Sequence, residues 1–263
     1  MDLGIKGKVA FVAAASKGLG RAVAEELAAE GASLVLCARN AENLNLVAGQ
    51  IAETSGVPVL PVAADVSKTE DVMRAVQAGI EKFGRIDILV TNAGGPPAGR
   101  FDDLSREMWD AATRLTFNSV LELTRAVLPG MKRHGWGRIL NITSITVKQP
   151  VDNLMLSNSL RAAVTGFART LANEVATDGI TVNNILPGYT RTERMEALAR
   201  AASAREGITE AEASARWEAE IPMKRLGEPH EFAALAAFLV SERASYITGT
   251  SIPVDGGWIR SLV

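Results

Sequence analysis

Short runs of apolar residues alternate with segments of helical periodicity along the whole chain of 263 residues. The apolar runs are continuous rather than alternating in polarity, which is typical of parallel strands buried on both faces. There are seven of them, at 8–15, 33–38, 57–65, 86–94, 137–143, 181–188 and 251–257. Strands separated by helices predict one α/β domain over 1–263, a doubly wound, parallel, seven-stranded sheet of the Rossmann type.

One segment interrupts this alternation. Residues 191–225 are helical in pattern, highly charged and placed directly after a predicted strand. Because ligands in such folds lie beyond the carboxyl ends of the strands, we expect this segment to form a helical lid over a site. A pair of solvated surface helices is the alternative. The apolar positions of the segment 191–225 would suit a medium-sized ligand. They include Met195, Leu198, Trp217 and Ile221.

The turn after the first predicted strand is rich in small residues. Residues 13–20 read AAASKGLG and lead into a predicted helix. Small side chains let a pyrophosphate approach the backbone, and the helix N-terminus supplies free amides. Asp65, residues 92–94 and residues 187–188 each end a later strand. These strand ends converge on one crevice, which predicts a dinucleotide site.

Together these motifs resemble those of the short-chain dehydrogenase/reductase (SDR) family, close in pattern to the 3-oxoacyl-carrier-protein reductase group. The family's T-G-x-x-x-G-x-G loop aligns with 13–20, and its strand-end motifs align with 65–66, 92–94 and 187–192. The segment ITGTSIPVDGG (247–257) also fits, so the resemblance covers nearly the whole chain. We expect the dinucleotide to be held by Ala14, Ser16, Lys17, Gly18, Leu19, Gly20, Arg39, Asp65, Val66, Asn92, Ala93, Gly94, Arg161, Pro187, Gly188 and Thr192.

Ala14 departs from the family, which has a glycine at this position. A β-carbon disfavours positive φ, so we expect a slightly altered turn. Gly18 and Gly20 remain, and the loop is still expected to bind a dinucleotide.

The charges near the predicted ribose distinguish between two cofactors. NAD-binding proteins of this type place an acidic residue at the end of the second strand, where this chain has Ala38 followed by Arg39. Lys17 lies in the glycine loop, within plausible reach of the same ribose. Two cations and no carboxylate suit a 2′-phosphate, so we predict NADP(H) rather than NAD(H). The alternative is that both cations are ordinary surface charges.

The resemblance also implies a set of catalytic groups, and here the sequence differs. The family uses an asparagine that anchors a water, a serine that bonds the substrate oxygen, and the tyrosine and lysine of Y-x-x-x-K. Asn118 and Ser144 are the expected counterparts of the first two. The family spacing puts Ser157 and Arg161 at the tyrosine and lysine positions. They are one helical turn apart and share a face, so the geometry of the pair is retained while its chemistry is changed.

This replacement removes the family's proton donor. A serine hydroxyl is far less acidic than a tyrosine hydroxyl, whose unperturbed pKa is about 10, and its side chain is shorter. Arg161 is expected to bond the ribose or polarise a carbonyl without releasing a proton. The remaining candidates are Lys148, which follows Ser144, Tyr189, which follows Pro187-Gly188, and water.

Three hypotheses follow. The first is an NADP(H)-dependent oxidoreductase that acts on a small carbonyl or hydroxyl compound with non-standard proton donation. The second is a non-redox protein of the same fold, either a dinucleotide-bound sensor or a dehydratase or isomerase. The third is a structural or interaction protein, which would leave the cofactor motifs without a role.

Composition and charge limit the partners and the cellular location that we expect for this protein. A net charge of −2 and a pI near 5.9 argue against nucleic acid as the main partner. No apolar stretch approaches the length of a membrane span, and a single cysteine, Cys37, cannot form an internal disulfide, so we expect a cytoplasmic protein. No cluster of residues has the spacing of metal ligands. The resemblance implies a homotetramer, or a homodimer, joined through 105–132, 153–176 and the C-terminal strand.

Overall fold

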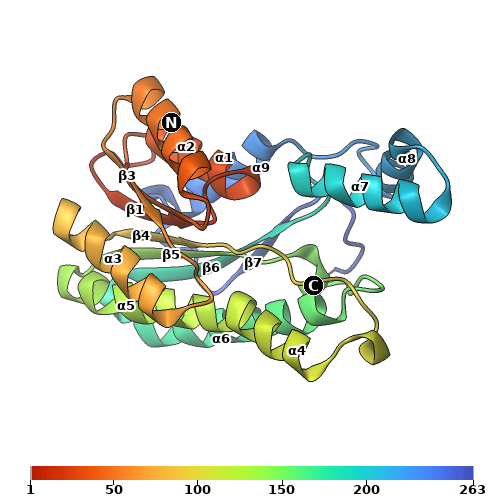
Figure 1. Ribbon diagram of the computed structural model, residues 1–263. Helices are drawn as coiled ribbons and strands as arrows, with labels where there is room; N and C mark the ends of the chain where they lie inside the picture. Colours follow the sequence, from red (N-terminus) through yellow and green to blue (C-terminus); the bar gives the residue numbers. More distant parts are fainter. Residues whose placement is uncertain (1, 263) are drawn as a thin grey trace.

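The computed structural model describes residues 2–262 and shows one sheet covered by helices on both faces (Figure 1). The strands fall where the apolar runs predict them, and most are shorter than their runs. They are β1 (Val9–Ala13), β2 (Ser33–Ala38), β3 (Val59–Ala63), β4 (Ile88–Thr91), β5 (Gly137–Ile142), β6 (Ile180–Pro187) and β7 (Ser251–Val254).

All strand pairs are parallel, and the order across the sheet is β3-β2-β1-β4-β5-β6-β7. The predicted doubly wound, seven-stranded Rossmann-type sheet is thereby confirmed. The chain builds outward from β1 to β3 and then returns to place β4 on the other side of β1. This reversal is the topological switch point at which ligands of open α/β sheets bind.

The continuous apolar character of the strands has a direct structural cause. Along β1, Ala10 and Val12 face one side of the sheet, whereas Val9, Phe11 and Ala13 face the other. Both sides are covered, so both sets of side chains are buried. One face holds α1 (Gly18–Ala29), α2 (Ala41–Ser55) and α9 (Pro229–Leu239), and the other holds α3 (Thr69–Phe83), α5 (Ser119–His134) and α6 (Met155–Val175).

A row of polar side chains crosses the sheet from the last residue of β4 to the first residue of β7. Thr91 donates to Asn141 Oδ1 at 2.7 Å, Asn141 donates to Asn184 Oδ1 at 3.0 Å, and Asn184 donates to Ser251 Oγ at 3.0 Å. These residues are neighbours in the strand register. Since a buried amide without partners is costly, the row holds β4 to β7 in one register.

The remaining helices lie beyond the carboxyl ends of the strands. α4 (Arg106–Thr113) precedes a π-helical turn, η2 (Arg114–Asn118), which runs directly into α5. The segment 191–225 contains α7 (Glu193–Glu206) and α8 (Glu210–Glu220), which confirms its helical pattern. These two helices lie at one end of the molecule in Figure 1.

Candidate dinucleotide and catalytic site

The glycine loop forms a tight turn between β1 and α1. Gly18 has a φ of 57°, in the left-handed region that favours glycine. Ala14 has a φ of 51°, so it keeps a left-handed conformation in spite of its β-carbon. Holding an alanine in this conformation costs about 1–2 kcal/mol.

Gly20 brings two loops together at the switch point. A β-carbon at Gly20 would clash with the carbonyl oxygen of Ala14 and would lie 2.9 Å from Asn92 Nδ2. The side chain of Asn92, at the end of β4, therefore rests directly on the first turn of α1. The motif that follows β4 lines the same crevice as the glycine loop, as the sequence predicts.

The N-terminus of α7 reaches the same crevice from the opposite side. A β-carbon at Gly18 would lie 3.8 Å from both Thr192 Cγ2 and Glu193 Oε2. Thr192 is the residue before α7, and its hydroxyl donates to Thr190 O at 3.3 Å. The loop after Pro187-Gly188 is held to the sheet by the Gly188 amide, which donates to Val254 O at 3.0 Å.

The ends of β2 and β3 carry the groups predicted to surround the adenosine. Partial burial acts to raise the pKa of Asp65, but hydrogen bonds from Ser67 and the nearby charge of Arg39 outweigh it, and the pKa is lowered. Arg39 and Lys17 are both exposed, and neither forms an ion pair among residues 2–262. Both cations are therefore free to meet a phosphate.

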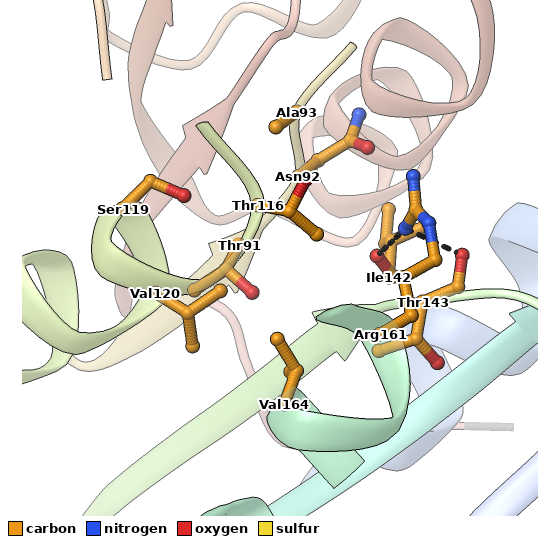
Figure 2. A pocket seen from close by; sticks show the side chains of 10 residues that line it. All are labelled: Thr91, Asn92, Ala93, Thr116, Ser119, Val120, Ile142, Thr143, Arg161 and Val164. Carbon is orange, nitrogen blue, oxygen red and sulfur yellow. Dashed lines mark hydrogen bonds between the residues drawn. The ribbon is translucent and has the colours of Figure 1, made fainter. Parts of the chain in front are cut away.

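Arg161 projects from α6 toward the end of β5. Its Nη1 donates to the carbonyl oxygens of Ile142 at 3.1 Å and Thr143 at 2.7 Å (Figure 2). Burial, together with the like charge of Arg194, lowers the pKa of Arg161 to about 10. The helix and the strand end are thus tied together immediately before Ser144.

A cavity of about 10 Å³, the size of one small water site, lies beside Arg161. Figure 2 shows the side chains that line it, which are Thr91, Asn92, Ala93, Thr116, Ser119, Val120, Ile142, Thr143, Arg161 and Val164. Thr116 and Thr143 each have a buried hydroxyl without a hydrogen-bond partner. Such orphaned groups beside a cavity suit an ordered water.

The structure does not place Asn118 in this cavity. Its side chain is exposed, and Thr116 lines the cavity instead. Both residues lie in the π-helical turn 114–118, whose extra residue rotates the side chains away from the phase of an ordinary α-helix. The fold thus brings Thr116 to the cavity beside Arg161, and the catalytic role of Asn118 stays a prediction.

Ser144, Ser157 and Lys148 lie on two segments next to Arg161. Ser144 directly follows β5 and Thr143, and its hydroxyl accepts a hydrogen bond from the Thr146 amide at 3.2 Å. Ser157 is half-buried in the first turn of α6, one turn before Arg161. Lys148 is exposed at the end of the 3-10 turn that starts after Ser144.

Tyr189 is held in an aromatic cluster. Its ring stacks on Trp217 of α8 and meets Trp258 edge to face, each at a centroid distance of 5.9 Å. Burial, aided by the charge of Glu220, raises the pKa of Tyr189 above its usual value. Tyr189 is therefore a poorer acid than an ordinary tyrosine and joins the segment 191–225 to the body of the protein.

Residues 2–262 contain neither a candidate metal-ion cluster nor a candidate membrane-spanning helix. No group of three or more histidine, cysteine or acidic side chains is arranged to hold a metal ion. No helix in the described part of the chain is both long and apolar enough to cross a membrane.

The sequence profile of the family described as Enoyl-(Acyl carrier protein) reductase matches residues 13–259. The dehydrogenase/reductase SDR family member 4 of Oryctolagus cuniculus is 34% identical over 251 residues, which are 95% of this chain and 93% of that protein. The chain belongs to the short-chain dehydrogenase/reductase family.

Solved structures agree with this assignment. L-sorbose reductase from Gluconobacter frateurii, complexed with NADPH and L-sorbose, has a TM-score of 0.96 and 38% identity, with all of both chains covered. Actinorhodin polyketide ketoreductase with NADPH has a TM-score of 0.92 and 32% identity over 97% of this chain and 98% of that one. Both similar structures are therefore reductases bound to NADPH.

Proposed function

We propose that this protein is an NADP(H)-dependent oxidoreductase that interconverts a carbonyl compound and an alcohol. The observation that carries this proposal is the contact of Gly20 with Asn92 at the switch point, next to Arg161 and the end of β5. This contact lies at the crevice in which this fold is expected to bind a dinucleotide. The reductases similar in structure to this chain, which bind NADPH, support the same function.

The residues present fit NADP(H). Gly18 leaves room for a pyrophosphate at the N-terminus of α1, and Gly20 allows this turn to pack closely against Ala14 and Asn92. Arg39 and Lys17 would hold the 2′-phosphate, since the adjacent strand end offers no carboxylate to a ribose hydroxyl. The other proposed contacts come from Ala14, Ser16, Leu19, Asp65, Val66, Asn92, Ala93, Gly94, Arg161, Pro187, Gly188 and Thr192.

The bound nicotinamide would supply or accept the hydride. Residues of this chain would bind the substrate oxygen and transfer its proton. Ser144 would donate a hydrogen bond to the substrate oxygen. Arg161, anchored on Ile142 and Thr143, would stabilise negative charge developing on that oxygen and bond the ribose. Thr116 would hold a water beside Arg161, the role that the family gives to asparagine. Ser157 and Arg161 would replace the family's tyrosine and lysine.

We propose Lys148 as the proton donor, directly or through water. Its amino group offers N–H donors and lies at the end of the short turn that begins at Ser144. Tyr189 is the weaker candidate because its ring is fixed between Trp217 and Trp258 and its pKa is raised.

We also propose that 191–225 acts as a lid of the single domain and that the enzyme is a homotetramer. The contact of Thr192 with Gly18 supports a lid, since it places the start of α7 over the crevice. β7 supports an oligomer, since all four of its residues are only half-buried at the edge of the sheet. The substrate class suggested by the resemblance is a 3-oxoacyl compound.

Oxidation of NADPH by a panel of ketones and 3-oxoacyl thioesters tests the proposal. We expect measurable turnover with NADPH, and a loss of about 10²-fold in kcat for Ser144→Ala. Ser241→Ala is the control, because Ser241 caps a 3-10 turn at the other end of the strands. Stable binding of NADPH with no oxidation by any of these compounds would contradict the proposal.

The absence of a tyrosine at 157 favours one second candidate, a dinucleotide-bound protein without hydride transfer. The double variant Ser157→Tyr with Arg161→Lys separates the two functions. In a working reductase with altered proton donation, the variant should raise kcat or shift its pH profile. In a protein that never transfers hydride, it should leave NADPH unoxidised.

A further inference from the structure

Two arginines, Arg161 and Arg194, lie near the segment 92–95 that follows β4. A β-carbon built on Gly95 would lie 2.6 Å from Cζ of Arg194, so the guanidinium of Arg194 rests against the main chain just after the Asn92 motif. Arg194 is also close enough to Arg161 for its charge to lower the pKa of Arg161. Both arginines lie near the segment that follows β4, since Arg161 lines a cavity with Asn92 and Ala93, and Arg194 contacts Gly95.

No acidic side chain balances this pair. Among residues 2–262, neither Arg161 nor Arg194 forms an ion pair, and the other nine residues that line the Arg161 cavity are uncharged. Only one nitrogen of Arg161 bonds the carbonyl oxygens of Ile142 and Thr143. Arg161 is half-buried and Arg194 is exposed. Two like charges repel each other, and an anion placed between them relieves that repulsion.

The position of the pair separates it from the pyrophosphate of a bound dinucleotide. At the start of α7, Glu193 faces Gly18 and the first turn of α1, where a pyrophosphate would lie. Arg194 faces Gly95, beyond β4, and Arg161 bonds the end of β5 next to Ser144. The pair therefore lies apart from the first turn of α1, near the ends of β4 and β5 and close to Ser144.

We propose that the substrate is an oxo acid whose carboxylate is held between Arg161 and Arg194. Because Arg161 bonds the carbonyl oxygen of Thr143, which directly precedes Ser144, the carboxylate would be near the reacting carbonyl, as in a 2-oxo or 3-oxo acid. This proposal rests on the proposed function for the reaction itself, but its binding step is tested independently of turnover. Arg194, from the lid, would couple substrate binding to the position of α7.

Matched acid and ester pairs test the proposal. The probes are 2-oxo-4-phenylbutanoate and acetoacetate, each with its ethyl ester, titrated by calorimetry into the full-length protein with and without NADPH. We expect each acid to bind about tenfold or more tighter than its ester. Arg194→Gln should remove that preference and leave ester binding unchanged. Arg200→Gln, an exposed arginine on the same helix, should retain it.

Three other outcomes are decisive. Equal binding of acid and ester by the unaltered protein overturns the proposal. A loss of NADPH affinity in Arg194→Gln, with the ratio of acid to ester unchanged, also overturns it and assigns the pair to the cofactor phosphates. Acid binding that depends on Arg194, without oxidation of NADPH, supports the carboxylate site and instead refutes the proposed oxidoreductase function.

Discussion

The guanidinium of Arg161 donates a hydrogen bond of 2.7 Å to the carbonyl oxygen of Thr143. A residue of α6 is thereby fixed to the main chain that presents Ser144. Because arginine offers five donors in a rigid fork, it can make this contact and still face the crevice. In the proposed enzyme, Arg161 serves both as an anchor for the active-site turn and as a fixed positive charge.

Ala14 leads to a prediction about stability. Ala14→Gly removes a β-carbon from a left-handed residue, which is worth about 1–2 kcal/mol, and loses about 0.5–1 kcal/mol to the greater freedom of glycine in the unfolded chain. We expect a net gain of about 1 kcal/mol, seen as a rise of about 2 °C in the thermal unfolding midpoint. Ala15→Gly, at the next residue without a positive φ, should lower the midpoint.

Arg39 leads to a prediction about cofactor choice. Arg39→Gln removes one of two cations proposed to meet the 2′-phosphate, so NADPH affinity should fall about tenfold or more while NADH affinity changes little. Arg106→Gln on α4 is the control, because its exposed ion pair with Asp110 lies on another helix. An equal loss of affinity for NADPH and NADH would show that Arg39 does not bind the 2′-phosphate. Fluorescence titration measures both affinities.

Lys148 and Tyr189 are distinguished by kinetics. Lys148→Met should lower kcat by about 10²–10⁴-fold, because general acid catalysis contributes that much. Tyr189→Phe should keep kcat within a few fold, because the ring would retain its contacts with Trp217 and Trp258. The opposite result would assign the proton donation to Tyr189: a large loss of kcat and a changed pH dependence of kcat in Tyr189→Phe, with little change in Lys148→Met.

Glu231 leads to a prediction about acid stability. Its carboxylate accepts hydrogen bonds from both terminal nitrogens of Arg225, at 2.7 Å and 2.6 Å, and these bonds lower its pKa from 4.5 to about 2. A depressed folded-state pKa means that the stabilisation is complete above about pH 4.5 and is lost as the pH falls toward 2.

Glu231→Gln should therefore lose less thermal stability than the unaltered protein when the pH is lowered through this window. Glu53→Gln, at an exposed residue without an ion pair in the described chain, should follow the unaltered protein. Identical pH dependence of the Glu231→Gln and unaltered proteins would show that the Arg225–Glu231 pair contributes nothing to acid stability.

The sheet could be predicted from the sequence because its information is local. Each strand is buried on both faces, so each appears as an uninterrupted apolar run, and the motifs at strand ends follow from the parallel topology. The sequence therefore predicted that residues 92–94 approach the glycine loop, where the structure has the contact of Asn92 with Gly20.

The remaining parts of the site depend on features without a local pattern. The π-helical turn 114–118 changes the phase of the helix, so counting along the sequence selected Asn118 where the fold presents Thr116. The strain at Ala14 depends on how the whole turn is held. Arg194 reaches Gly95 only through the placement of α7 against the strand ends, which is a tertiary relationship.

Titration of the purified protein with NADPH and with NADH tests the central claim most directly, with quenching of tryptophan fluorescence and protection against heat as the two readouts. The account predicts saturable binding of NADPH, at least tenfold tighter than that of NADH, with a matching rise in the unfolding midpoint. Failure of both dinucleotides to bind or protect would contradict the assignment of this crevice to NADP(H), and with it the proposed oxidoreductase function.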